Sequence, residues 1–146
     1  MPPFRYFLRV RYGECDPQRV VFNARYGDYV DLAVAEYFRA LGFEKEIQTG
    51  ELDYQLVKQT IEWRAPARYD QVLEISVSTK HLGVTSFALL TEFRLAGEER
   101  IIVTSETVYV HVDTHTLTKA PLPTHVREAL TRGAPGATVD HAAWRG

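Results

Sequence analysis

The sequence contains one cysteine in 146 residues, so no disulfide can form within the chain. It has no run of about 18 apolar residues, the length that a membrane-spanning helix needs, and its first residues lack the apolar core of a secretion signal. Neither sign of charge dominates, since the formal net charge is −2. The balance gives no general attraction to nucleic acid or anionic lipid. We therefore expect a cytoplasmic protein without nucleic-acid or membrane partners.

Apolar residues make up 45% of the sequence, which is enough for the core of one domain. There is no internal repeat and no low-complexity tract. We expect a single domain over residues 1–132. Residues 133–146 are predicted to form a C-terminal tail that is poorly ordered.

Alternation and helical spacing of apolar residues predict the order of elements. An alternating strand runs through Phe4, Tyr6, Leu8 and Val10, and an amphipathic helix is expected from Ala24 to Leu41. A polar loop over residues 44–53 follows. Further strands are predicted over residues 55–64, 72–80, 85–95 and 100–112, and a short helix over 124–131. One long helix covering one face of an antiparallel sheet gives an α+β domain with an unpaired edge, for which oligomerisation is the usual remedy.

The segment from Val10 to Tyr29 carries the clearest chemical pattern. Asp16 lies in a turn that contains Pro17, and the following helix begins near Asn23. A carboxylate beside a helix N-terminus combines a base or nucleophile with a site that stabilises developing negative charge. That combination suits attack on a carbonyl group. Taken alone, Asp16 is more typical of a turn than of a catalytic group, and Asn23 is typical of an ordinary helix cap.

Three motifs together resemble the hotdog-fold acyl-CoA thioesterases, in particular the 4-hydroxybenzoyl-CoA thioesterase branch. They are YGECDP followed by VVF (residues 12–22), IEWRAPARYDQVLEI (61–75) and the ending from Val112 to Pro123. The resemblance covers about residues 7–130. It implies a five-stranded antiparallel sheet wrapped around one long helix. It also implies a homodimer or a dimer of dimers, hence a homotetramer, with active sites at the subunit interface.

The resemblance implies hydrolysis of the thioester bond of an acyl- or aroyl-CoA to the free acid and CoA. Asp16 matches the catalytic aspartate of the family, and either attacks directly or deprotonates water. The backbone N–H of Asn23 matches the group that polarises the thioester carbonyl. No metal or separate cofactor is expected, because CoA is part of the substrate. The predicted substrate-binding residues are Arg19, Tyr26, Arg64, Thr85 and Ser86.

Two departures from the family pattern affect the mechanism. Gln18 and Arg19 stand where the family commonly has small residues, including glycine. Asn23 stands where many relatives have histidine, and an asparagine side chain is not an acid or base near neutral pH. Polarisation by the backbone N–H survives, because it does not depend on the side chain.

Other readings of the polar residues are weaker. Glu36 on the helix is a second candidate carboxylate, but we expect it to be a polar-face or interface residue. His111, Asp113 and His115 alternate like metal ligands, yet the chain turns there. Cys15 is expected to be structural, because neighbouring carboxylates disfavour its thiolate.

Two further functions fit the same motifs. An acyl-carrier-protein thioesterase acts on the same reacting group, and a non-catalytic acyl-CoA-binding protein of the hotdog fold is a second alternative. Hotdog dehydratases rely on a histidine with a carboxylate, and the motif around Asp16 has no histidine.

Overall fold

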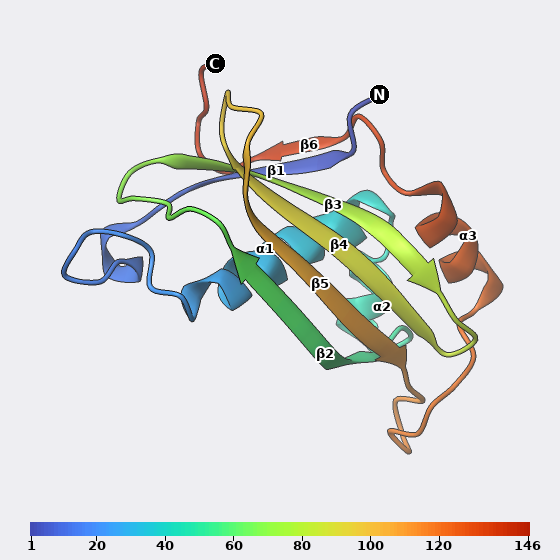
Figure 1. Ribbon diagram of the computed structural model, residues 1–146. Coiled ribbons are helices and arrows are strands. Elements are labelled where there is room, and N and C mark those ends of the chain that lie inside the picture. The colour runs from blue at the N-terminus through green and yellow to red at the C-terminus, as the bar shows by residue number, and fades with distance from the viewer.

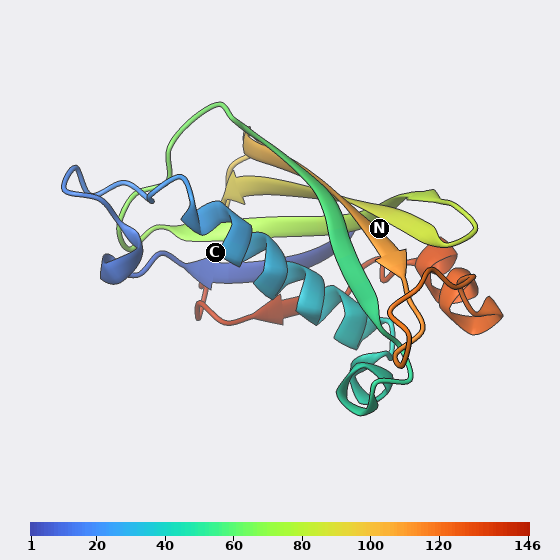
Figure 2. The ribbon, with the colours of Figure 1, turned by 90° about the horizontal axis from the view of Figure 1, so that it is seen from below.

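The computed structural model describes residues 1–146 and shows a curved six-stranded sheet with one long helix lying across its concave face (Figures 1 and 2). The strands are β1 Phe4–Arg9, β2 Tyr54–Trp63, β3 Val72–Leu82, β4 Ser86–Leu95, β5 Ile101–His111 and β6 Thr138–Asp140. The helices are α1 Arg25–Ala40, α2 Glu44–Thr49, α3 Thr124–Arg132 and the short 3-10 helix η1 Tyr12–Glu14. The spatial strand order is β2-β5-β4-β3-β1-β6.

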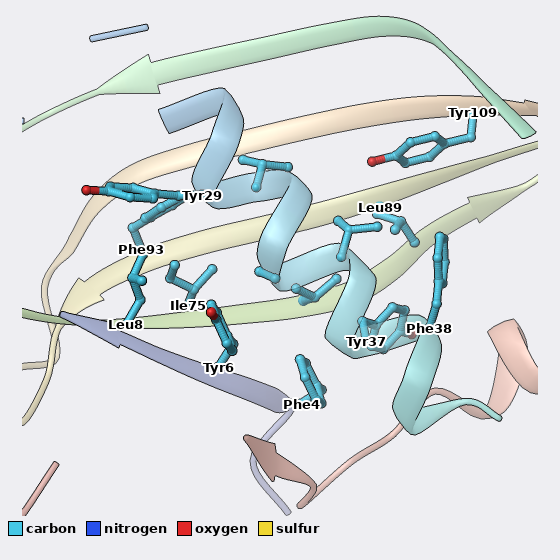
Figure 3. Packing of buried hydrophobic residues seen from close by; sticks show 14 of the residues in the cluster. Phe4, Tyr6, Leu8, Tyr29, Tyr37, Phe38, Ile75, Leu89, Phe93 and Tyr109 are labelled. Atoms are coloured by element: carbon cyan, nitrogen blue, oxygen red, sulfur yellow. The ribbon is translucent and has the colours of Figure 1, made fainter. Parts of the chain in front are cut away.

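Helix α1 is held on the sheet by the apolar face that its sequence predicted. Tyr26, Tyr29, Val30, Ala33, Val34, Tyr37 and Phe38 are all buried. They pack against side chains that alternate inward along β1, β3, β4 and β5, as Figure 3 shows for Leu8, Ile75, Leu89 and Phe93. The strands and the helix therefore share one hydrophobic core, between the concave face of the sheet and α1.

The sheet differs from the predicted one at its end. The sequence predicted five antiparallel strands, whereas a sixth strand, β6, pairs in parallel with β1. β6 arises within residues 133–146, which were expected to form a poorly ordered tail, and Ala142 just beyond it is buried against Phe7 and Val72. A three-residue strand is too short to show alternation in the sequence. The predicted loop 44–53 likewise contains helix α2, while the short helix at residues 124–131 is confirmed by α3.

The two ends of the sheet carry different structures. The loop from η1 to α1 lies at one end, beside the start of α1 and the end of β2, whereas the β3–β4 hairpin and α3 lie at the other (Figure 1). β2 is an edge strand that pairs only with β5, and most of its side chains are exposed. None of the helices has the length and apolar composition needed to cross a bilayer.

Candidate active site

Asp16 lies in a tight turn that its own backbone closes. The N–H of Asp16 donates to the carbonyl of Val20 at 2.9 Å, and the N–H of Arg19 donates to the carbonyl of Asp16 at 2.9 Å. The side-chain Oδ1 accepts the N–H of Gln18 at 2.8 Å, whereas Oδ2 accepts no hydrogen bond from the protein. The carboxylate is thus held by one oxygen and has the other available for chemistry.

A second segment, the chain that follows β2, holds the same loop from outside. Val21 donates its N–H to the carbonyl of Ala67 at 2.9 Å, and Tyr69 donates to the carbonyl of Arg19 at 3.0 Å. This segment belongs to the motif IEWRAPARYD, in which the sequence predicted only a strand end and a turn. The two sequence motifs therefore meet at one place in the fold.

The start of α1 leaves backbone donors free. A turn closes between Phe22 and Arg25, whose N–H donates to the carbonyl of Phe22 at 2.8 Å. The N-cap residue is Ala24, and no side chain caps the helix. Asn23 is therefore not a side-chain cap, and the N–H groups of Asn23 and Ala24 donate to no group of the protein. Free N–H groups at a helix N-terminus can bind and stabilise an oxyanion.

Two hollows are lined by this loop. A cavity of about 260 Å³ is lined by Val20, Val21, Asn23, Tyr26, Trp63, Arg64, Ala65 and Pro66. A larger hollow of about 480 Å³ is lined by Tyr12, Gly13, Cys15, Asp16, Pro17 and Arg19. Within one chain, Asn23 lines the first of these hollows and Asp16 lines the second.

Three of the predicted substrate-binding residues lie at these hollows. Tyr26 is buried at the floor of the first cavity, where its hydroxyl accepts the N–H of Ala67 at 3.3 Å and its ring packs edge-on against Trp63. Arg64 also lines this cavity and donates to the hydroxyl of Thr104 at 2.8 Å. Arg19 lies in the hollow with Asp16, is exposed, and makes no ion pair.

Thr85 and Ser86 lie elsewhere in the chain. They belong to the β3–β4 hairpin, where the N–H of His111 donates to the carbonyl of Thr85 at 2.7 Å, at the end of the sheet far from Asp16 (Figure 1). A single chain does not bring them to the carboxylate. Their part in substrate binding stays a prediction that depends on a second subunit.

The other polar candidates have structural partners. Glu36 forms an ion pair with Arg39, at 3.4 Å between Oε1 and Nε. Asp113 accepts the N–H groups of His115 and Thr116, which lowers the pKa of its carboxyl and closes the turn after β5. Burial, together with the carboxylates of Glu14 and Asp16, raises the pKa of the Cys15 thiol. Glu36 and Asp113 thus each have a structural partner within the chain.

Sequence reasoning missed the lining residues that come from the segment after β2 and from the Asp16 loop itself. Ala65, Pro66 and Val20 form walls of the first cavity although their side chains carry no chemistry. The only signal for them was the position of the motif at residues 61–75.

Arg19 has a left-handed backbone, with φ of 61°. This conformation suits the glycine that is common at this part of the family motif.

Comparison with known proteins places the chain among thioesterases. Residues 10–130 match the Thioesterase-like superfamily. The chain belongs to this family. It is 30% identical over 121 residues to the Acyl-CoA thioester hydrolase YbgC of Escherichia coli, which covers 82% of this chain and 90% of that protein.

Solved structures of this family have the same fold. A hypothetical protein from Aquifex aeolicus is 26% identical, with a TM-score of 0.80 over 88% of this chain and 99% of the other. The BH1999 gentisyl-coenzyme A thioesterase is also 26% identical, with a TM-score of 0.76 over 87% of this chain and 98% of the other. The family and the hotdog thioesterase fold predicted from the three motifs are thereby confirmed.

Proposed function

We propose that this protein is an acyl-CoA thioesterase, which uses Asp16 and the backbone N–H of Asn23 to hydrolyse the thioester bond of an acyl- or aroyl-CoA. One observation carries the proposal. In this thioesterase-family chain, one loop carries a carboxylate oxygen that accepts no hydrogen bond from the protein. The same loop leads into a helix N-terminus whose N–H groups donate to no group of the protein. Relatives named as acyl-CoA and gentisyl-coenzyme A thioesterases support this class of substrate.

Both roles proposed for Asp16 give the same balanced reaction. As a base, the carboxylate takes a proton from water, the hydroxide adds to the thioester carbonyl, and CoA leaves as a thiolate that recovers the proton. As a nucleophile, the carboxylate displaces the CoA thiolate to form a mixed anhydride, which water then hydrolyses. In each case the carbonyl oxygen gains negative charge, which the N–H of Asn23 stabilises. One such donor typically contributes about 100- to 1,000-fold in rate.

The complete site is proposed to need two subunits. The free edge of β2 presents a row of unpaired backbone groups, and Leu56, Val57 and Trp63 on it are exposed. Two copies of β2 that pair antiparallel would cover this edge and continue the sheet. Such pairing brings the Tyr54 end of the partner strand to the Trp63 end of this one. The partner then borders the cavity at Asn23 and covers the exposed Trp63.

The assay that tests the proposal follows free CoA with a thiol reagent, over short-chain, long-chain and aromatic acyl-CoA esters. We expect turnover by the natural chain and a loss of at least about 100-fold in Asp16→Asn, with folding and oligomer size unchanged. Glu36→Gln is the matched control, because it neutralises the other candidate carboxylate and should keep full activity. Turnover that survives in Asp16→Asn would show that Asp16 is not the catalytic group. No release from any CoA ester would instead favour a carrier-protein thioester or a binding role.

The subunit arrangement has its own test. Val57→Asp puts a charge on the free edge of β2, where Val57 is 57% exposed, and we expect it to convert the oligomer to monomers with little activity. Leu117→Asp is the control, since Leu117 is equally exposed but lies in the turn after β5. Light scattering coupled to gel filtration measures the mass. A monomeric natural chain with full activity would contradict the two-subunit site.

A further inference from the structure

Glu14 is a carboxylate that the proposed mechanism does not use, although it lies only two residues before Asp16. It is buried, with 9% of its surface exposed. Oε1 accepts the N–H of Arg11 at 2.8 Å and the hydroxyl of Tyr29 at 2.7 Å, while Oε2 accepts Nε and Nη2 of Arg11 at 2.9 and 2.5 Å. Burying a carboxylate lowers the stability of the fold unless the group is paired and hydrogen-bonded. Here four hydrogen-bond donors offset that loss.

The charge of Glu14 is set by these donors. Burial on its own raises the pKa of the carboxyl, but the hydrogen bonds from Arg11 and Tyr29 outweigh burial and hold the pKa below its usual value. Burial and the bond to Glu14 raise the pKa of the Tyr29 hydroxyl, so it stays a neutral donor. The pair is therefore an ionised acceptor and a neutral donor at physiological pH.

The bond between Glu14 and Tyr29 joins the two halves of the candidate site. Glu14 ends η1 and is followed at once by the Asp16 turn, whereas Tyr29 lies in the second turn of α1, whose start carries the Asn23 N–H. Figure 3 shows Tyr29 on the same helix as Tyr37 and Phe38, with its hydroxyl directed away from that cluster. The main chain makes a parallel link, because the N–H of Phe22 donates to the carbonyl of Glu14 at 2.9 Å.

We propose that Glu14 and Tyr29 are positioning residues, whose hydrogen bond fixes the Asp16 carboxylate relative to the Asn23 N–H. The inference rests on the proposed thioesterase function. Asp16 makes few side-chain contacts of its own, since a single oxygen is bonded to its own turn. Its place relative to the helix therefore depends on neighbours such as Glu14. A displacement of about 1 Å between reacting groups can lower a rate by about 100-fold.

The alternative is that the bond only stabilises the fold, and a matched pair of variants separates the two roles. Tyr29→Phe removes the hydroxyl that binds Glu14. Tyr37→Phe removes another buried hydroxyl of the same helix, which bonds to the Thr79 hydroxyl at 2.9 Å away from the loop. Both variants lose one hydrogen bond and keep a ring of nearly the same shape. The bond to the ionised Glu14 is the stronger of the two, so Tyr29→Phe should lose more stability, and turnover is compared per folded molecule.

The expected result is a difference in turnover alone. Tyr29→Phe and Glu14→Gln should each lower kcat of the folded enzyme by about 10- to 100-fold while KM changes less than about threefold, and Tyr37→Phe should leave both unchanged. The double variant should be no slower than the slower single one, because Glu14→Gln weakens and Tyr29→Phe removes the same link. Fluorescence or circular dichroism confirms the folded fraction of each sample.

The other outcomes reject either the positioning role or the proposed function. Equal kcat in the natural chain, Tyr29→Phe and Glu14→Gln, with Asp16→Asn inactive, would reject the positioning role and leave the proposed function standing. Losses that multiply in the double variant would also reject it, since independent effects are not one link. If the natural chain hydrolyses no thioester, the proposed function fails first and this inference fails with it.

Discussion

The two ends of helix α1 are built in opposite ways. Around Phe38, near its C-terminal end, five aromatic rings pack with centroid distances of 5.1 to 6.4 Å, namely Tyr37, Phe43, Tyr54, Phe87 and Tyr109. At the N-terminal end the helix starts without a side-chain cap, and two N–H groups have no partner. Phe22 is 56% exposed there, whereas Phe38 is 2% exposed.

This contrast separates stability from function along one helix. The C-terminal half removes apolar surface from water, and its buried Tyr37 hydroxyl bonds to the hydroxyl of Thr79 at 2.9 Å. The N-terminal end leaves donors and an apolar side chain without partners, which costs stability and is typical of a place where a ligand or a second subunit binds. Substitutions at each end of the helix test this division.

The largest effect on stability is expected at Phe38. Phe38→Ala leaves a cavity within the aromatic cluster and should lower the free energy of unfolding by about 3–5 kcal/mol. The activity of the molecules that remain folded should change little, because Phe38 lies far along the helix from Asp16. Urea unfolding gives the first quantity and CoA release per folded molecule gives the second. A variant that is stable but inactive would mean that the two ends are not separate.

At the N-terminal end, a backbone substitution tests the proposed oxyanion donor. Asn23 follows the first residue of the turn between Phe22 and Arg25, a position that accepts proline readily. Asn23→Pro therefore removes the N–H with little change of fold, and we expect kcat to fall by about 100- to 1,000-fold. Asn23→Ala keeps the N–H and should retain activity within about threefold. Equal activity in both variants would show that this N–H does not stabilise the oxyanion.

Glu14 predicts a dependence of stability on pH. Its pKa in the folded chain lies below the usual 4.5, so the stabilisation is fully present above that value and is lost as the pH falls through the folded pKa. Near pH 7, Glu14→Gln should lower the free energy of unfolding by about 1–3 kcal/mol. At about pH 3 the difference between the two chains should shrink, because protonated Glu14 resembles glutamine. Urea unfolding at both pH values measures this difference in the free energy of unfolding. A difference that stays constant would contradict a lowered pKa of Glu14 in the folded chain.

The sequence predicted most of the fold because its signals are periodic and local. The helix expected at residues 24–41 is α1 at Arg25–Ala40, and the strand expected at 72–80 is β3 at Val72–Leu82. β6 could not be predicted, since three residues show no period and its pairing with β1 joins opposite ends of the chain. Helix α2 was also not predicted, because its six residues are mostly polar and show little apolar periodicity.

The candidate site was predictable to a smaller extent. Asp16 and Asn23 stood out through motif and helix position, whereas the roles of Glu14 and Tyr29 depend on a hydrogen bond across 15 residues that no spacing rule predicts.

The backbone conformation of Arg19 could not be predicted from the sequence either. Its left-handed backbone is visible only in the structure, and Arg19→Gly should stabilise the loop by about 1 kcal/mol in urea unfolding. A loss of stability would show that the Arg19 side chain has favourable contacts.

The smallest effect on stability is expected from the exposed counterpart of Phe38. Phe22→Ala removes a ring that is mostly in water, so the free energy of unfolding should stay within about 0.5 kcal/mol of the natural value. Phe22 lies between Val21 and Asn23, which both line the smaller cavity, so a bound acyl group or a second subunit can cover its ring. We therefore expect KM to rise while kcat stays within about twofold. Steady-state kinetics with the best ester found in the CoA-release assay measures both. An unchanged KM together with lower stability would place Phe22 with Phe38, as part of the core rather than of the site.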